Sequence, residues 1–348
     1  MKKWHKALLA FICSFLICNL LCMAYNSGPG GLYRKNGATR IHIPNRYYIY
    51  GTEGYGILRF DKNGYNNIDG ELAESYVLLM GSSQVEGVQF AQGKNMTAVL
   101  NQFLGGTKEC LKAYNIAASA NHFPTVVKGF KAGISEFPDS NAVIIEIGST
   151  TFSIDDLNDS LNQTVYDSSS KGSNLVDNMT VKQKFTACIK QALPLAKLIV
   201  SEQLKGIDLP EENPFGLRWM PLQEQEEDII DVSHYNKLLN EALSLIREEY
   251  ENPIIIFYHP KIELSSDGMV IARDEETYDI FKSACERNNI IFADMGDAFI
   301  EAYESDYTVP YGFANTEMGQ GHLNEDGHAI IAQELYQILM GIQGVDLK

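Results

Sequence analysis

The chain has 348 residues, of which 45% are hydrophobic and 21% are charged, with 28 glycines and 11 prolines. This composition predicts an ordinary globular protein and excludes a disordered chain, a collagen and a disulfide-rich miniprotein. The 45 acidic and 28 basic residues give a net charge of −17, and we expect no nucleic-acid partner because the phosphate backbone repels such a protein.

An uncharged apolar run from Ala7 to Tyr25 lies near the N-terminus of the chain. At about 1.5 Å per residue in a helix, this run is long enough to cross a hydrocarbon core of about 30 Å. Three lysines precede it and the residues from Asn26 to Gly30 are uncharged, which places the N-terminus in the cytoplasm and the rest of the chain outside. A cleaved signal peptide is the alternative, but such peptides usually have a shorter apolar run and a small-x-small cleavage site. We predict an uncleaved signal-anchor over residues 1–27 of a single-pass protein of the cell membrane.

Residues 28–72 are rich in glycine, asparagine and tyrosine, and we interpret them as an N-terminal arm docked on the main domain. Short strands are expected at Tyr47–Tyr50 and Ile57–Phe60, followed by a turn at Asp61–Gly64. From residue 73 on, apolar runs typical of strands alternate with helical stretches, and we expect residues 73–348 to form the main domain.

The main domain shows strands that alternate with helices. Apolar runs predict strands at Tyr76–Met80, Leu111–Ile116, Ala142–Ile147, Pro253–Tyr258 and Ile290–Ala293. Helices are expected at Met96–Leu104, Pro124–Phe137, Glu276–Arg287 and Asp326–Met340. This alternation predicts an α/β fold: a three-layer α/β/α sandwich with a five-stranded, mainly parallel sheet of the flavodoxin-like kind. Residues from about 152 to 235 do not fit a simple crossover and are interpreted as an insertion.

No pattern in the chain predicts a metal or a cofactor. Three of the six cysteines lie in the apolar run, and Cys110, Cys188 and Cys285 have no metal-ligand spacing. Gly28-x-Gly30 has no predicted strand before it and no helix after it, so it is not a dinucleotide fingerprint. We therefore expect neither a disulfide framework, nor a zinc site, nor a cofactor.

Two residues have the positions of a nucleophile and its base. Ser83 follows the first strand of the main domain in a glycine-bounded turn, at the sheet edge where ligands bind in open α/β folds. His322 lies in a glycine-rich loop before the last helix, and a neutral imidazole is well suited to take a serine proton near neutral pH. Each residue alone is more readily explained as an ordinary turn serine or loop histidine.

Considered together, four segments resemble the sequence blocks of the SGNH/GDSL hydrolase superfamily. They are LLMGSSQVEG at 78–87, YNIAASA at 114–120, IIEIGSTT at 144–151 and GHLNEDGHAIIA at 321–332. Their order and their placement at strand ends match, and the resemblance covers roughly Ser75 to Leu339. It implies an ester hydrolase that uses a serine nucleophile and no cofactor.

The resemblance assigns a role to each matching position. Ser83 takes the nucleophile position, and its backbone N–H forms part of the oxyanion hole. His322 is the general base. The other oxyanion donors fall on the backbone N–H of Ala117 and on the side chain of Thr150, where the family has glycine and asparagine. A threonine hydroxyl is a shorter donor than an amide, so a weakened oxyanion hole is expected.

Three further residues are expected to line the substrate pocket. They are Asn115 in the second block, His259 after the fourth strand and Asn315 near His322.

The family's acid is missing from its usual place. An Asp-x-x-His motif would need aspartate at position 319, which is Gly319 here. Either Ser83 and His322 act as a dyad with a backbone carbonyl on the imidazole, or an acid such as Glu317 or Asp326 reaches in from another position. Losing the acid costs about 10⁴ in kcat in serine proteases, so this departure bears directly on activity.

The leading hypothesis is an extracytoplasmic serine esterase or O-acyltransferase that acts on small acyl esters, such as acetyl groups of cell-surface carbohydrate. Hydrolysis and transfer share the acyl-Ser83 half-reaction and differ only in whether water or a sugar hydroxyl accepts the acyl group. The alternative is a non-catalytic surface protein that keeps the fold and binds carbohydrate or a protein partner.

Overall fold

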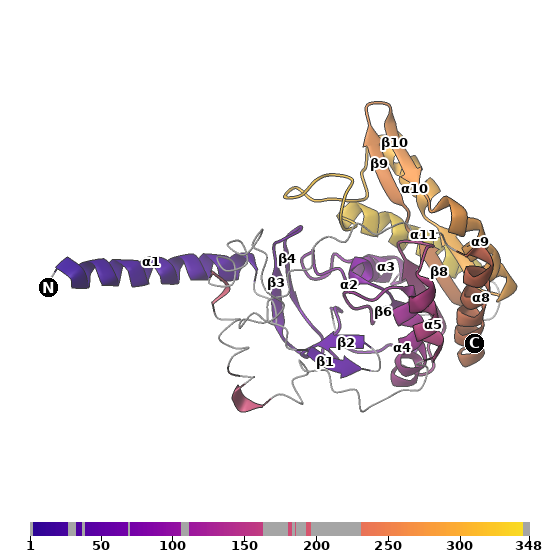
Figure 1. The fold of residues 1–348 in the computed structure, drawn as a ribbon, viewed down its shortest axis with the longest axis horizontal. Coiled ribbons are helices and arrows are strands. Elements are labelled where there is room, and N and C mark those ends of the chain that lie inside the picture. Colours follow the sequence, from indigo (N-terminus) through magenta and orange to yellow (C-terminus); the bar gives the residue numbers. More distant parts are fainter. Residues whose placement is uncertain are drawn as a thin grey trace.

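The computed structural model describes residues 3–26, 33–36, 39–68, 70–105, 111–162, 180–182, 185, 193–195 and 231–343. Its main domain is built around one five-stranded parallel sheet with helices on both faces (Figure 1). A long N-terminal helix projects away from this domain, and the strands of the arm lie between the two (Figure 1).

The central sheet has the strand order β6-β5-β7-β8-β11, and every neighbouring pair is parallel. Its strands are β5 (Tyr76–Met80), β6 (Lys112–Asn115), β7 (Ala142–Ile147), β8 (Ile254–Tyr258) and β11 (Ile291–Asp294). All five strands predicted from the sequence lie in this sheet, within one residue of the expected bounds. The chain adds β6 on one side of β5 and then crosses to β7 on the other, which opens a crevice at the carboxyl end of β5.

Two layers of helices cover the sheet because its buried strands carry apolar side chains on both faces. Val77 and Leu79 of β5 face one layer, and Leu78 and Met80 face the other. The first layer consists of α3 (Met96–Leu104), α10 (Gly296–Asp306) and α11 (Glu325–Gln343). The second consists of α4 (Phe123–Glu136), α5 (Ile154–Asn162), α8 (Val232–Glu249) and α9 (Glu275–Arg287). The predicted three-layer α/β/α sandwich is confirmed.

A hairpin that the sequence analysis did not predict follows β8. It consists of β9 (Lys261–Ser265) and β10 (Gly268–Ala272), and it projects from the main domain (Figure 1). Only Ile262 and Met269 are buried in it, so it lacks the continuous apolar run that marks the sheet strands. The predicted insertion over about residues 152–235 lies mostly outside the described residues.

The arm forms two antiparallel hairpins. The first joins β1 (Tyr33–Asn36) to β2 (Thr39–His42), and the second joins β3 (Tyr47–Tyr50) to β4 (Gly56–Arg59). The two short strands expected in the arm thus correspond to β3 and, shifted by one residue, to β4.

Side-chain amides join the arm to the edge of the central sheet. Asn67 donates to the carbonyl oxygen of Asn115 at 3.0 Å and accepts the backbone N–H of Asn115 at 2.9 Å. The hydroxyl of Tyr114 donates to Asp61 at 2.6 Å. The arm therefore satisfies backbone groups at the end of β6 that would otherwise be left unpaired.

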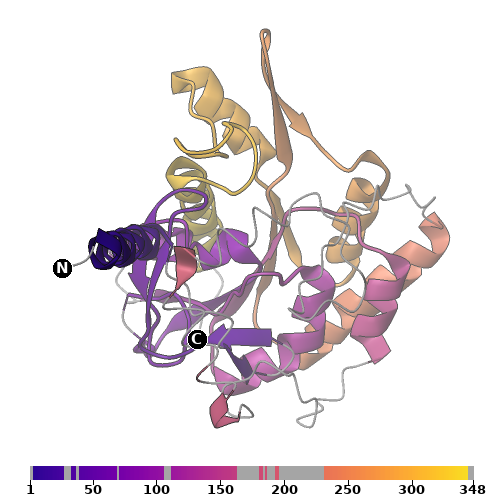
Figure 2. The same ribbon diagram turned by 60° about the vertical axis from the view of Figure 1, so that its left-hand side comes forward.

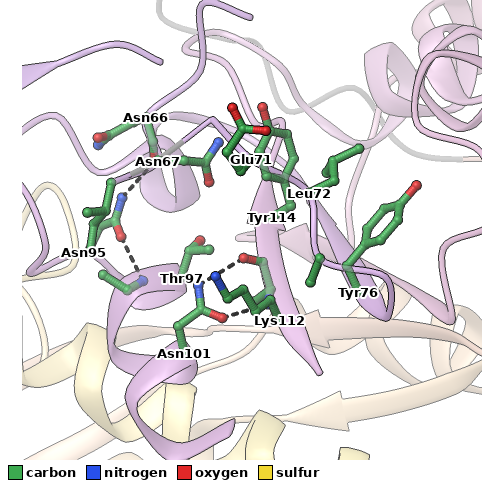
Figure 3. A pocket seen from close by; sticks show the side chains of 14 residues that line it. Asn66, Asn67, Glu71, Leu72, Tyr76, Asn95, Thr97, Asn101, Lys112 and Tyr114 are labelled. Atoms are coloured by element: carbon green, nitrogen blue, oxygen red, sulfur yellow. Dashed lines mark hydrogen bonds between the residues drawn. The ribbon is translucent and has the colours of Figure 1, made fainter. Parts of the chain in front are cut away.

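A pocket of about 130 Å³ lies at this junction, between the arm, α3 and β6 (Figure 3). Its asparagines bond to backbone groups of neighbouring elements. Asn95 donates to the carbonyl oxygen of Asn66 at 3.2 Å, and Asn101 accepts the backbone N–H of Ala113 at 2.7 Å (Figure 3). We interpret this pocket as a seam between the arm and the main domain.

The N-terminal helix α1 (Lys3–Tyr25) is long and apolar enough to cross a membrane, with a mean hydropathy of 2.5 over 18 residues. Its N-terminal part extends away from the rest of the chain, and its C-terminal end reaches the arm (Figures 1 and 2). There it contacts β3.

Candidate active site

Ser83 begins the short helix α2 (Ser83–Glu86), directly beyond the carboxyl end of β5. The turn requires glycine at Gly81, because a Cβ there would lie 2.6 Å from an oxygen of Glu146. The side chain of Ser82 caps α2 by accepting a backbone N–H at 3.2 Å. The local sequence thus places Ser83 at the sheet edge where ligands bind.

The loop before α11 brings His322 to Ser83. Nε2 of His322 lies 2.8 Å from Oγ of Ser83, although 239 positions separate the two residues. A backbone bridge between Tyr311 and Leu323 closes the loop, and the N–H of Leu323 donates to the side chain of Gln84 at 2.8 Å. The structure therefore brings the predicted nucleophile and base within hydrogen-bond distance.

A carboxylate from the arm contacts the other side of His322. Oε2 of Glu53 lies 2.5 Å from Nδ1 of the imidazole, and Oε1 accepts the backbone N–H of His322 at 2.6 Å. The carboxylate can only accept a hydrogen bond, so it favours the neutral ring with its proton on Nδ1. The lone pair is then on Nε2, which faces the Ser83 hydroxyl. The three side chains form a serine–histidine–glutamate series.

The carboxylate beside the imidazole belongs to neither of the two acids expected from sequence. Glu317 and Asp326 are exposed, and Glu53 occupies the position beside Nδ1 that a backbone carbonyl would have taken. At the position where the resemblance would place an acid, Gly319 has φ of +84°, a backbone conformation that strains other residues, and a Cβ there would lie 2.9 Å from the side chain of Leu264. Nothing in the sequence around Glu53 marks it as an acid of the site.

Asn315 holds the loop that carries Glu53. Its Oδ1 accepts the N–H of Gly54 at 2.9 Å, and its Nδ2 donates to the carbonyl oxygens of Gly51 and Gly54 at 3.0 and 3.1 Å. Asn315 was expected to bind substrate. Its amide joins the loop of residues 51–54 to the loop of His322, and its role in substrate binding stays a prediction.

The arm also reaches the helix of the nucleophile. Nε2 of His42, in the arm, lies 2.7 Å from the carboxylate of Glu86, the last residue of α2. That carboxylate also accepts the backbone N–H of Ser119 at 2.9 Å. Burial opposes ionisation of Glu86, but the contacts with His42 and Ser119 outweigh it and hold the pKa of Glu86 below its usual value. The arm is thus linked to both the acid and the nucleophile.

The second-block residues bond to one another rather than facing Ser83. The N–H of Ala117, an expected oxyanion donor, donates to Oδ1 of Asn115 at 2.8 Å. The amide of Asn115 donates in turn to the carbonyl oxygen of Val85 at 2.9 Å, and Asn115 is fully buried. Asn115 therefore holds α2 through the carbonyl of Val85 and does not line the pocket beside Ser82. The N–H of Ala117 is already paired with Asn115.

Thr150 is also fully buried and differs from the expectation. Its backbone N–H donates to Asp274 at 2.7 Å, and its Oγ1 lies 3.0 Å from the hydroxyl of Thr277. These contacts tie the end of β7 to α9, so the side chain is not presented to Ser83. Of the three expected oxyanion donors, the N–H of Ser83 keeps a favourable position, since the first N–H groups of a helix have no intrahelical partner.

A pocket of about 280 Å³ lies beside the nucleophile turn. It is lined by Ser82, Gln84 and Gly321, which adjoin Ser83 and His322, and by Asn121, His122 and Lys261. Asn121 and His122, which the sequence analysis did not single out, directly follow the second block. Their position one and two residues beyond a strand-end block is the one signal that could have found them.

A buried polar network supports the turn. Glu146 accepts the backbone N–H of Ser82 at 2.6 Å and contacts Nε2 of His259 at 2.7 Å, and Nδ1 of His259 lies 2.8 Å from the hydroxyl of Tyr311. Burial opposes ionisation of Glu146, but the hydrogen bonds from His259 and Ser82 outweigh it and keep the pKa of Glu146 below its usual value.

His259 was expected to bind substrate. It lines the pocket, but both of its ring nitrogens are engaged inside the protein, so its first role is to hold Glu146.

Among the described residues, no group of three or more histidine, cysteine, aspartate or glutamate side chains is arranged to hold a metal ion.

No family model and no curated protein matches this chain. Among solved structures, it is similar to an α/β hydrolase enzyme from the metagenome of Lake Arreo, at 15% identity and a TM-score of 0.43, covering 77% of this chain and 95% of that one. An acetylxylan esterase from Geobacillus stearothermophilus is 16% identical with a TM-score of 0.40, covering 76% and 94%. A member of the lipolytic protein G-D-S-L family from Veillonella parvula is 13% identical with a TM-score of 0.36, covering 76% and 98%.

Proposed function

We propose that this chain is a divergent serine hydrolase of the SGNH type that cleaves small acyl esters through an acyl-Ser83 intermediate. The observation that carries the proposal is the series from Ser83 Oγ through the two nitrogens of His322 to Glu53, joined at 2.8 and 2.5 Å. A nucleophile in contact with a base that is itself oriented by an acid is the arrangement required for acyl transfer.

The first half-reaction transfers the acyl group to the enzyme. Nε2 of His322 takes the hydroxyl proton as Oγ of Ser83 attacks the carbonyl carbon of the ester. Glu53 stabilises the imidazolium that forms, and the N–H of Ser83 donates to the oxyanion. The intermediate then collapses, the bond to the alcohol oxygen breaks, and His322 returns the proton to the leaving alcohol.

The second half-reaction regenerates the serine. His322 takes a proton from water, which attacks the acyl carbon, and returns it to Oγ of Ser83 as the carboxylic acid leaves. A sugar hydroxyl in place of water would yield a new ester, so the same residues support O-acyl transfer.

We infer that the acyl group is small, such as acetyl, and that it is carried on carbohydrate. The pocket of about 280 Å³ next to Ser82 offers Asn121, His122 and Lys261, whose polar groups suit the hydroxyls of a sugar.

We also propose that α1 remains as an uncleaved anchor with the main domain outside the cytoplasm. Three lysines before the apolar run and its length support this topology. The intact mass of protein extracted from membranes should include residues 1–26. A mass that corresponds to a chain beginning near Asn26 would show cleavage instead.

The test of the catalytic proposal uses the full chain purified in detergent. It should release acetate from p-nitrophenyl acetate and from an acetylated oligosaccharide, and Ser83→Ala and His322→Ala should each remove nearly all turnover. A fluorophosphonate should label Ser83. Ser266→Ala, at an exposed serine of the β9–β10 turn, is the matched control and should retain full activity. Full turnover by Ser83→Ala would reject the enzyme and favour the non-catalytic binding protein.

A further inference from the structure

The end of the membrane helix contacts the loop that carries Glu53. The hydroxyl of Tyr55 donates to the carbonyl oxygen of Ala24 at 2.8 Å, and the side chain of Asn26 donates to the hydroxyl of Thr52 at 2.8 Å. Tyr25 lies so close to Gly51 that a Cβ on this glycine would be 2.3 Å from the Tyr25 carbonyl oxygen. The last turn of α1 and residues 51–55 thus form one contact, and Figure 1 shows the end of α1 beside the arm.

This contact limits how far the catalytic histidine lies from the membrane helix. Glu53 is two positions after Gly51, a span of at most about 7 Å along an extended chain. The glutamate side chain then reaches His322 directly, with its carboxylate 2.5 Å from Nδ1. Adding the Tyr25–Gly51 contact and a side-chain length to these spans puts the imidazole within about 20 Å of the end of α1.

The arm carries exposed side chains of the kind found at membrane surfaces. Tyr55, Tyr47 and Ile57 are 54%, 69% and 47% exposed. The guanidinium of Arg59 lies 5.8 Å from the ring of Tyr47. Tyrosines are enriched at the lipid–water interface, and an arginine there attracts anionic headgroups. These residues belong to the same hairpin as Glu53, so the surface next to the site suits contact with a bilayer.

We propose that the arm seats the catalytic centre on the outer surface of the membrane, and that its substrate is an acylated saccharide attached to a lipid. The proposal rests on the ester-cleaving function above and on α1 as the anchor. The enzyme then acts on esters held within about 20 Å of the bilayer, the reach set by the contact between the end of α1 and the loop of Glu53. Acylated polymers far from the membrane are poor substrates by the same geometry.

The test measures turnover as a function of the height of the ester above the bilayer. The full chain is reconstituted in vesicles of phosphatidylglycerol and phosphatidylethanolamine that also contain an acetylated disaccharide joined to a diacyl lipid by an oligoproline spacer. Spacers of about 3 and about 15 prolines hold the ester about 9 and about 46 Å from the lipid, at about 3.1 Å per residue. The short spacer should give at least about threefold higher turnover than the long one, because it raises the effective ester concentration at the site.

A protein variant provides the matched control. A Gly/Ser segment of about 12 residues inserted between Tyr25 and Asn26 adds about 20 Å of flexible reach, and it should remove the preference for the short spacer. Turnover of p-nitrophenyl acetate by the same vesicles is the reference for both proteins, so a general loss of activity cancels in the ratio.

The outcomes separate the two proposals. Equal turnover of both spacers with active hydrolysis of p-nitrophenyl acetate would overturn the membrane-surface inference and leave the esterase intact. Release of fatty acid from the vesicle phospholipids, in preference to acetate, would replace the lipid-linked saccharide with a phospholipid substrate and overturn it as well. No hydrolysis of any ester would reject the proposed function itself.

Discussion

Glu53 binds both the backbone N–H and the ring Nδ1 of His322, although 269 positions separate the two residues in the chain. The carboxylate therefore fixes the loop and the imidazole together, at 2.6 and 2.5 Å. An acid that enters from the arm has a structural consequence: the site is complete only when the arm is docked on the main domain.

Replacing Glu53 should disable catalysis while leaving the fold intact. Glu53→Gln keeps the shape of the side chain but removes the charge that stabilises the imidazolium, and it can hold the ring in the wrong tautomer. We expect kcat for p-nitrophenyl acetate to fall by about 10³- to 10⁴-fold, as for the acid of serine proteases. The measurement is steady-state hydrolysis, with circular dichroism to verify folding.

The two acids expected from sequence provide the controls. Glu317→Gln and Asp326→Asn change exposed carboxylates near the histidine loop and should leave kcat within about twofold of the wild type. A large loss in either variant, together with an active Glu53→Gln, would show that Glu53 is not the acid of the site.

The parallel sheet was predictable because its strands are continuous apolar runs. β5, β7 and β8 are buried along their whole length, and such strands stand out from amphipathic helices without any alignment. The hairpin β9–β10 has mostly exposed residues and no such run, so the same reasoning missed it.

The site was predictable from the sequence only where a reactive residue type follows a recognisable strand end or turn. Ser83 and His322 follow recognisable turns, and the structure places them 2.8 Å apart. Glu53 lies in an arm loop with no local pattern, and its role depends on tertiary docking. The assignments of Ala117 and Thr150 followed the family's spacing, but hydrogen bonds to Asn115 and Thr277 take up those groups here.

Asn315 should act as a positioning residue for Glu53. Asn315→Ala removes three hydrogen bonds to the acid loop and should lower kcat by about tenfold with little change in KM, because small displacements of a catalytic group are costly. The discriminating measurement is a double-mutant cycle. In the Glu53→Gln background, Asn315→Ala should cause little further loss of kcat. Equal losses of kcat in both backgrounds would mean that Asn315 acts independently of the acid.

Thr150 should matter for stability and not for turnover. Thr150→Val keeps the shape of the side chain but removes the hydroxyl that contacts Thr277, so the free energy of unfolding should fall by about 1 kcal/mol. Turnover of p-nitrophenyl acetate should stay within about twofold, whereas the loss of an oxyanion donor costs about 10²- to 10³-fold in kcat. Urea unfolding and steady-state kinetics on the same sample separate the two roles, and a loss of about 10² in kcat would restore Thr150 to the oxyanion hole.

His328 should make the fold sensitive to mild acid. It is buried against Phe90, and its Nδ1 accepts the backbone N–H of Met96 at 2.7 Å. Burial, with the nearby His259 and His322, lowers the pKa of His328 from 6.5 to about 3. Between these two pH values the unfolded chain binds a proton at this residue and the native chain does not, so the free energy of unfolding falls as the pH falls.

The expected slope is about 1.4 kcal/mol per pH unit for this one proton, developing below about pH 6.5. His328→Asn places an amide oxygen near the Met96 N–H and removes the titrating group. Between pH 7 and pH 4.5, the slope of unfolding free energy against pH should therefore be smaller in this variant, by about the contribution of that one proton. Urea unfolding at several pH values measures both proteins, and parallel pH profiles for the wild type and His328→Asn would show that this histidine does not carry the acid sensitivity.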